Sequence, residues 1–179
     1  MMPCEPMMYL LKGTNLITKS LMVLQNSLDA LSRSGVILFP SDTVLGLGCD
    51  ATNQDAVNTI FLIKNRSQEK SLIALVSDME MLTTYVETIP QSVHEILKGN
   101  RSPTTIVYPK AKGIAPMAMA EDGSMAFRIP KSGFALDLVK SFGKPIIATS
   151  ANLSGEPIPE NESQVDRRIL EQVDYVVPL

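Results

Sequence analysis

The sequence predicts a single α/β domain, residues 1–179, in which helices flank a twisted sheet of mixed parallel and antiparallel strands. Short runs rich in β-branched and aromatic residues alternate with longer segments whose apolar residues recur every three or four positions. Hydrophobic residues make up 45% of the 179 residues, which is enough to close one sizeable core. The chain has no repeat and no low-complexity tract, so a second domain is not expected.

The first predicted elements are a helix, two strands and a second helix. Four leucines at helical spacing predict a helix over 20–34 that ends in a left-handed cap at Gly35. Residues 36–39, closed by Pro40, are typical of a strand buried on both faces, and 43–49 predict a second strand. Residues 52–55 resemble a capping box, which begins a helix that ends near Lys64. The leucines are Leu21, Leu24, Leu28 and Leu31.

The remaining chain continues the alternation of strands and helices. Pro109 and Pro130 close two of the expected strands, and Gly143 ends one of the expected helices. Strands are expected over 72–76, 104–108, 125–129, 145–147 and 175–177, and helices over 79–85, 91–97, 134–142 and 163–172.

Composition excludes several classes of protein. Two cysteines and one histidine are too few for a disulfide framework or a zinc site, and no apolar run is long enough to span a membrane. We therefore expect a cytoplasmic protein. The net charge of −3 argues against unspecific binding of nucleic acid. Basic residues nevertheless gather over 98–112, where no acid occurs, and acids gather after 156, so one basic and one acidic surface are expected.

Small hydroxyl and amide side chains follow the predicted strand 145–147. The run from Thr149 to Gly155 offers donors and acceptors with little bulk, as a phosphate or carboxylate site at the edge of an α/β sheet requires. The chain has neither GxxxxGK[ST] nor GxGxxG, so a nucleotide would be held in another way than in those motifs. The alternative is that the run has only a structural role, as a strand end followed by a turn at Gly155.

Two further sets of residues carry the same ambiguity between structure and ligand binding. The turn 41–43, with two hydroxyls and a carboxylate, either only reverses the chain or recognises the ammonium or hydroxyl group of a small ligand. Arg128 interrupts an apolar strand, so it needs an anion or carbonyl partner unless strand alternation places it on a solvated face.

Cations gather where the helix that ends near Lys64 stops. Lys64 and Arg66, with Lys70 four residues beyond Arg66, either complement the helix dipole on a solvated face or clamp a triphosphate. In such a clamp, arginine supplies a forked contact and lysine a point charge. None of the four sets contains a nucleophile with an adjacent base. Any chemistry here would therefore depend on positioning and charge.

Taken in order, the four sets resemble the YrdC-type threonylcarbamoyl-AMP synthases, the enzymes that begin threonylcarbamoyladenosine formation in tRNA. The likeness runs from Gly35 to Gly155 in the order Pro-Ser-Asp-Thr, Gly-Leu-Gly-Cys-Asp-Ala, Lys-x-Arg, an arginine strand and Thr-Ser-Ala-Asn-Leu-Ser-Gly. The resemblance implies a YrdC-like fold with a concave basic cleft. It also implies a nucleotidyltransferase that makes L-threonylcarbamoyladenylate and pyrophosphate from L-threonine, bicarbonate and ATP.

The resemblance assigns a role to each candidate residue. Lys64 and Arg66 are expected as a catalytic phosphate clamp, with no enzyme nucleophile. Threonine is expected to contact Thr43, Arg128 and Thr149, and ATP to contact Lys64, Arg66, Lys70, Thr105, Ser150 and Asn152. Magnesium is expected to arrive with the ATP phosphates rather than at a protein metal site. Expected partners are downstream tRNA-modifying proteins and tRNA or double-stranded RNA, and no membrane.

Two other functions stay open. An RNA-binding or ribosome-maturation module would use the basic segment 98–112, although the net charge of −3 and the 5% aromatic content oppose it. A paralogue of the same fold with an altered substrate, as in the YciO branch, would be expected to lose Ala151 and Asn152, which this sequence retains.

Overall fold

The computed structural model describes residues 6–65, 72–100 and 102–178, with the backbone alone for residues 6–17. The helices are α1 (Pro6–Ser32), α2 (Gln54–Lys64), α3 (Met79–Tyr85), α4 (Gln91–Gly99), α5 (Phe134–Phe142) and α6 (Arg167–Leu170), with 3-10 turns η1 (Pro116–Ala118) and η2 (Glu162–Gln164). The strands are β1 (Ile37–Pro40), β2 (Leu45–Asp50), β3 (Ile73–Leu75), β4 (Thr105–Tyr108), β5 (Met125–Arg128), β6 (Ile146–Ser150) and β7 (Tyr175–Val176).

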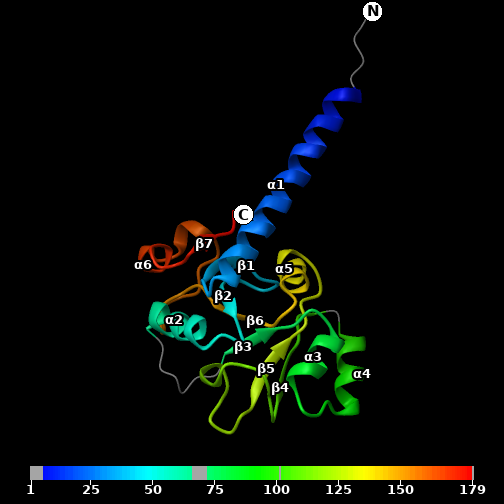
Figure 1. The fold of residues 1–179 in the computed structure, drawn as a ribbon, viewed down its shortest axis with the longest axis vertical. Helices are drawn as coiled ribbons and strands as arrows, with labels where there is room; N and C mark the ends of the chain where they lie inside the picture. The colour runs from blue at the N-terminus through cyan, green and yellow to red at the C-terminus, as the bar shows by residue number, and fades with distance from the viewer. Residues whose placement is uncertain (1–5, 66–71, 101, 179) are drawn as a thin grey trace, which may run out of the picture.

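Seven strands form one mixed sheet in the order β4-β5-β3-β6-β2-β1-β7 (Figure 1). The pairs β1 with β7 and β3 with β5 are parallel. The pairs β1 with β2, β2 with β6, β3 with β6, and β4 with β5 are antiparallel. The predicted α/β fold with a mixed sheet is therefore confirmed.

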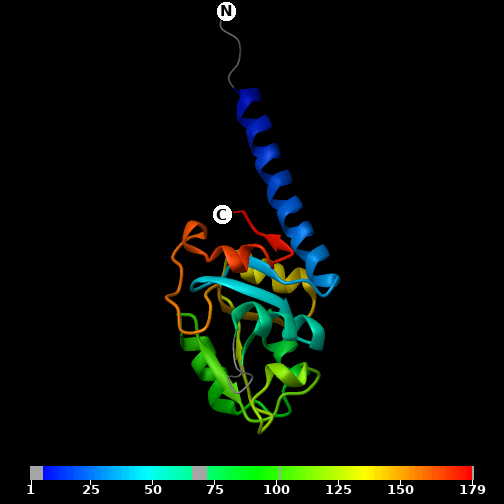
Figure 2. The ribbon, with the colours of Figure 1, turned by 90° about the vertical axis from the view of Figure 1, so that its left-hand side faces the viewer.

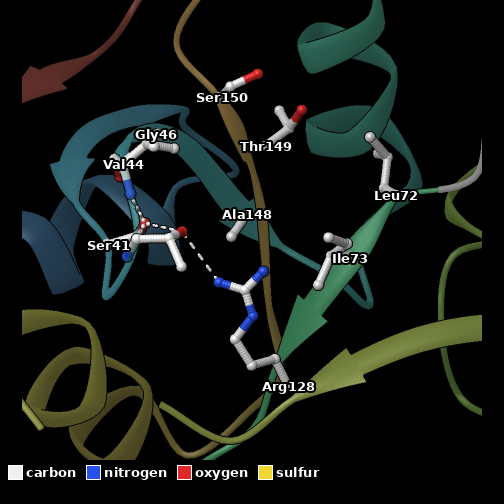
Figure 3. Close-up of a pocket in the computed structure, with 10 residues that line it drawn as sticks. Ser41, Val44, Gly46, Leu72, Ile73, Arg128, Ala148, Thr149 and Ser150 are labelled. Carbon is white, nitrogen blue, oxygen red and sulfur yellow. Dashed lines mark hydrogen bonds between the residues drawn. The ribbon is translucent and has the colours of Figure 1, made fainter. Parts of the chain in front are cut away.

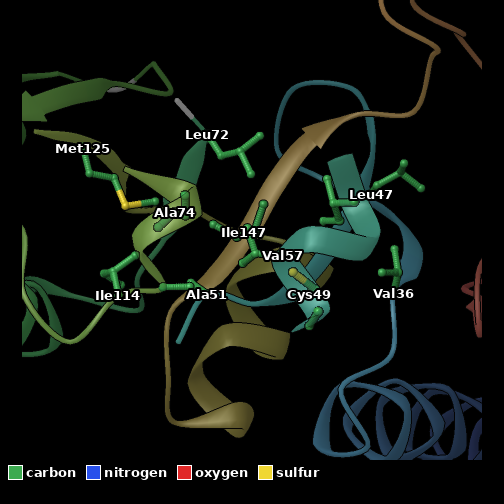
Figure 4. Close-up of a cluster of buried hydrophobic side chains, with 14 of the residues drawn as sticks. Val36, Leu47, Cys49, Ala51, Val57, Leu72, Ala74, Ile114, Met125 and Ile147 are labelled. Atoms are coloured by element: carbon green, nitrogen blue, oxygen red, sulfur yellow. The ribbon is translucent and has the colours of Figure 1, made fainter. Parts of the chain in front are cut away.

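The sheet separates two apolar clusters, and β1 contributes to both. Val36 and Leu38 lie in the larger cluster, under α2, whereas Ile37 and Phe39 lie in the smaller one, under α1 and α5. This alternation is that of a strand buried on both faces, as predicted. Figure 4 shows Cys49 within the larger cluster. Burial, and secondarily the charge of Asp50, raises the pKa of the Cys49 thiol well above its usual range, so the thiol stays protonated.

Helix α1 begins at Pro6, well before the expected start at residue 20, and its N-terminal half projects from the sheet (Figures 1 and 2). The C-terminal half packs on the smaller cluster through Leu24 and Leu28. The left-handed residue after this helix is Ser34, with φ 63°, and not Gly35. Gly35 is required for space instead. A Cβ there would lie 2.7 Å from the Ala30 main-chain oxygen.

The expected helix over 163–172 is wrong, because the chain forms the 3-10 turn η2 and then the short helix α6. Asp166 accepts a hydrogen bond from the Arg168 main-chain nitrogen over 2.8 Å and so starts a new helix inside the predicted one. Its side-chain hydrogen bond with Arg168 lowers the pKa of Asp166 to about 2. The start of α2 also differs, since Asn53 caps Ala56 and no acid returns the bond as a capping box requires.

No helix in the described ranges combines the length and the apolar character that crossing a bilayer demands.

Candidate active site

A cavity of about 280 Å³ opens over the sheet where β2, β3 and β6 lie side by side. Ile73 of β3 pairs with Ala148 of β6, and together they form part of its floor. Side chains two apart in a strand share a face, so the cavity lies on the face that α5 covers further along, over Leu75 and Ile146. The lining residues are Ser41, Thr43, Val44, Gly46, Leu72, Ile73, Arg128, Ala148, Thr149 and Ser150.

Arg128, the last residue of β5, joins three segments at one side of this cavity. Its Nε atom donates to Thr105 Oγ1 over 2.9 Å. Its Nη1 atom donates to Asp42 Oδ1 over 3.0 Å and to Thr43 Oγ1 over 3.1 Å. The side chains of Arg128 and Asp42 are only 14% and 7% exposed. Arg128 is therefore not on a solvated face, and Asp42 is the anionic partner that its buried position requires.

The turn after β1 presents the Thr43 hydroxyl to Arg128. Ser41 Oγ accepts hydrogen bonds from the main-chain nitrogens of Thr43 and Val44 over 3.2 and 3.1 Å. It also donates to the Val44 main-chain oxygen over 2.5 Å. These bonds form a serine turn that holds the Thr43 hydroxyl within hydrogen-bond distance of Arg128. The structural and the ligand-binding interpretations of this turn are therefore compatible.

Lys64, at the end of α2, is only 2% exposed, so it does not lie on a solvated face. Its Nζ atom donates to the main-chain oxygen of Ser150 and, over 2.7 Å, to that of Asn152. The Asn152 Oδ1 atom lies 3.4 Å away. Ser154 in turn donates its main-chain N–H to the Lys64 oxygen over 2.9 Å. These hydrogen bonds offset the unfavourable burial of the Lys64 charge, and they hold the loop 150–154 against α2.

The side chains of Ser150 and Asn152 in that loop also bind each other. Ser150 Oγ donates to Asn152 Oδ1 over 2.5 Å, and Asn152 Nδ2 donates to the Glu156 main-chain oxygen over 2.6 Å. The loop is therefore held from both sides. The Ser150 hydroxyl lies at the end of the cavity opposite Arg128 (Figure 3).

The structure brings most of the predicted site residues together. Thr43, Arg128, Thr149 and Ser150 line the same cavity. Lys64 and Asn152 do not line the cavity but hydrogen-bond to Ser150, and Thr105 likewise hydrogen-bonds to Arg128. Arg66 and Lys70 fall outside the described residues, so of the three expected clamp residues the structure describes only Lys64, whose Nζ binds main-chain oxygens.

Sequence reasoning missed the apolar floor and the role of Gly46. A Cβ at Gly46 would lie 3.1 Å from the Thr149 main-chain oxygen, so glycine lets β2 approach β6 closely beside the cavity. Gly46 and Gly48 stand two apart in a strand, and this spacing was the available signal for a close approach on one face. No local signal pointed to Ile73 or Ala148, because both read as ordinary core residues.

Comparison with known proteins places these observations in a family. The model of the Sua5/YciO/YrdC family, described as "Telomere recombination", matches residues 29–178. A threonylcarbamoyl-AMP synthase of Hahella chejuensis is 32% identical over 156 residues, which cover 87% of this chain and 85% of the relative. The enzyme of the same name from Photobacterium profundum is 32% identical over 157 residues, with 86% and 85% covered.

Solved structures agree with this match. The structure of P. abyssi Sua5 complexed with L-threonine superposes with a TM-score of 0.81 and 27% identity, covering 88% of this chain and 46% of that protein. This chain thus spans about half of that longer protein. E. coli YciO, at 22% identity and a TM-score of 0.75, shares the fold. The family match over residues 29–178 and the shared fold confirm the resemblance read from the sequence, and this chain belongs to the Sua5/YciO/YrdC family.

Proposed function

We propose that this chain is a threonylcarbamoyl-AMP synthase, which forms L-threonylcarbamoyladenylate and pyrophosphate from L-threonine, bicarbonate and ATP. The observation that carries the proposal is a single cavity with an arginine at one side and the hydroxyl groups of β6 at the other. Relatives that bear this enzyme's name align with most of the chain, which supports this function over an RNA-binding module.

The threonine side of the cavity is proposed at Arg128, Thr43 and Thr149. Within the described ranges, Arg128 uses Nε and Nη1 for protein contacts, and no partner is seen for Nη2. An arginine nitrogen with donors to spare in a partly enclosed cavity suits a carboxylate. The hydroxyls of Thr43 and Thr149 would contact the remaining polar groups of the amino acid. L-Threonine bound to P. abyssi Sua5 supports an amino acid of this kind.

The ATP side is proposed at the opposite end, around Ser150 and Asn152. Lys64 would act from beneath this loop, where its charge favours bound phosphates while its Nζ holds the main-chain oxygens of the loop. Arg66 and Lys70, outside the described residues, are proposed as the direct phosphate contacts. The contact of Thr105 with ATP stays a prediction, since its hydroxyl binds Arg128 here.

The reaction needs no protein nucleophile. The amino group of threonine adds to carbon dioxide derived from bicarbonate, loses a proton and becomes a carbamate. A carbamate oxygen then forms a bond to the α-phosphorus of ATP while the bond to the bridging oxygen breaks, and pyrophosphate leaves. The protein would hold the carbamate and the α-phosphate in line and stabilise the charge that develops on the phosphate oxygens.

Magnesium is proposed to enter with ATP. Across the part of the chain that the structure describes, no three side chains among histidine, cysteine, aspartate and glutamate come together. The hydroxyl and amide oxygens of Ser150 and Asn152 are hard donors that fit a magnesium–phosphate complex. The ion would neutralise phosphate charge, and phosphate oxygens and water would supply most of its ligands. The concave basic cleft, a cytoplasmic setting, and contacts with tRNA or with tRNA-modifying proteins downstream stay predictions.

One assay tests the proposed function. The purified chain is incubated with ATP, L-threonine, bicarbonate and magnesium, and pyrophosphate release is measured with each component omitted in turn. We expect release that requires both threonine and bicarbonate. Release that is independent of threonine would instead indicate a paralogue with another substrate. No release, together with salt-sensitive binding of double-stranded RNA, would indicate the RNA-binding module.

A further inference from the structure

The ion pair between Asp42 and Arg128 uses one oxygen of the carboxylate and one nitrogen of the guanidinium. Asp42 Oδ1 accepts from Arg128 Nη1 over 3.0 Å. The other carboxylate oxygen, Oδ2, is buried and has no hydrogen-bond partner within the described ranges. On the arginine, Nη2 likewise has no partner there, and Figure 3 shows the guanidinium beside Ile73 and Ala148.

A carboxylate and an arginine that served stability alone would be expected to close a fork with two parallel hydrogen bonds. An unpaired buried carboxylate oxygen is unfavourable, so the single contact needs another reason. Asp50, whose side chain is 8% exposed, provides a contrast within the same chain. Its Oδ1 accepts from Thr52 and its Oδ2 from Lys144, so both oxygens are paired.

The arrangement around Arg128 restrains the guanidinium at two of its three nitrogens. Thr105 holds Nε, while Asp42 and Thr43 hold Nη1. Nη2 is left on the side of the cavity that Arg128 lines. The negative charge of Asp42 also balances the arginine, so the pair carries no net charge at this side of the cavity. A rigid donor with a balanced charge suits a substrate that brings both a carboxylate and an amino group.

We propose that Asp42 is a positioning residue for the amino-acid substrate. Its carboxylate fixes the orientation of the Arg128 guanidinium and leaves Nη2 directed at the substrate carboxylate. This inference rests on the proposed function, because it requires that Arg128 bind the amino acid. Asp42 acts through Arg128 and does not itself contact the reacting atoms.

The test measures initial rates of pyrophosphate release against threonine concentration, with ATP, bicarbonate and magnesium in excess. The variants are Asp42→Asn, Arg128→Ala and the double variant, and Asp50→Asn is the matched control for loss of a buried, paired carboxylate. We expect Asp42→Asn to raise the threonine KM about tenfold and to change the ATP KM less than about twofold. In the Arg128→Ala background, Asp42→Asn should cause no further rise.

A merely structural role for Asp42 would give a different result. It would lower the melting temperature without moving the threonine KM, as we expect of Asp50→Asn, or it would add its effect to that of Arg128→Ala. Either outcome overturns the proposal. Should Asp42→Asn fail to fold, Asp42→Glu carries the test, because the longer side chain displaces the guanidinium. An unchanged threonine KM in that variant would also overturn the proposal.

The experiment distinguishes failure of the proposed function from failure of the proposed role of Asp42. Wild-type protein without threonine-dependent release would remove the proposed function and the role of Asp42 with it. Wild-type protein that depends on threonine, beside an Asp42→Asn variant with the same threonine KM, would remove only the role of Asp42.

Discussion

The ammonium group of Lys64 donates to the main-chain oxygen of Asn152 over 2.7 Å, across 88 residues of sequence. Lysine side chains ordinarily reach into solvent, but this one binds main-chain carbonyl oxygens inside the protein. Its aliphatic stem and its charge both lie between α2 and the loop that follows β6. The candidate ATP side of the cavity therefore depends on a residue that does not line it.

Lys64→Met removes this charge while keeping a side chain of similar length. We expect the free energy of unfolding to fall by about 1–3 kcal/mol, because the carbonyl oxygens of Ser150 and Asn152 lose their buried donor. Urea unfolding followed by circular dichroism measures the change. Lys110→Met is the control, since Lys110 and its partner Glu87 are both more than half-exposed and the loss of their ion pair should cost less than about 1 kcal/mol. Equal stability of Lys64→Met and wild type would contradict the prediction.

Arg66→Ala tests the proposed phosphate clamp. The substitution should lower threonine-dependent pyrophosphate release about a hundredfold, because a forked donor to phosphate oxygens is lost. The melting temperature should stay the same. Arg33→Ala, which removes an exposed arginine near the end of α1, should leave the rate unchanged. Unchanged turnover in Arg66→Ala would show that the phosphates bind elsewhere.

Gly35→Ala tests the tight passage from α1 to β1. A Cβ at this position would meet the Ala30 oxygen at 2.7 Å and Asp174 Oδ2 at 2.9 Å, and Asp174 also holds the Val36 nitrogen. We expect a loss of about 1–3 kcal/mol in thermal or urea unfolding. Gly99→Ala, at a site with nothing within 4 Å, is the control and should be neutral or slightly stabilising. Similar stabilities of the two variants would rule out steric crowding at Gly35.

Asp78 gives a prediction about pH. As the N-cap of α3, its carboxylate accepts from the Met81 nitrogen over 2.8 Å and from Ser77 Oγ over 2.7 Å. These two bonds, that of Met81 first, lower the pKa of Asp78 below its ordinary 3.8. A pKa that is lower in the folded state stabilises the protein above the unfolded pKa, and this contribution disappears as the pH falls through the folded pKa.

Asp78→Ala should therefore lower the free energy of unfolding by about 1 kcal/mol at pH 7, a typical effect of losing an N-cap. The difference from wild type should shrink as the pH falls below the ordinary value of 3.8. Urea unfolding at a series of pH values provides the measurement. A difference that stays constant down to acid pH would mean that the ionised carboxylate contributes nothing to the cap.

Much of this fold could be predicted from local patterns. The apolar spacing and terminal glycine of α5 gave its bounds, and α3 matched its predicted range of 79–85. The end of the chain could not be predicted in this way. Its polar sequence fits one helix, but the chain forms the turn η2 first and then begins α6 where Asp166 accepts from the Arg168 main-chain nitrogen. Similarly, periodicity alone could not show that Ser34, and not Gly35, takes the left-handed conformation.

The sequence could indicate several residues that line the candidate cavity, but it could not indicate their contacts. Hydroxyl, amide and cationic side chains at strand and helix ends marked Thr43, Arg128 and Ser150. Which of them meet depends on strand pairing, because Thr105 faces Arg128 only through the antiparallel register of β4 and β5. The ion pair of Arg128 with Asp42 joins residues 86 apart in sequence. The local sequence around Arg128 could therefore not identify Asp42 as its partner.

The pairing of β7 with β1 affects the order in which this protein can be completed. Of the described strands, β1 leaves the ribosome first and β7 last, yet they are parallel neighbours in the sheet. The main-chain N–H of Val36 donates to Asp174 Oδ2 over 2.7 Å. Until that segment emerges, β1 presents an unpaired edge to other chains. A nascent chain stalled before residue 174 would thus still expose this edge, even with every cavity-lining residue already synthesised.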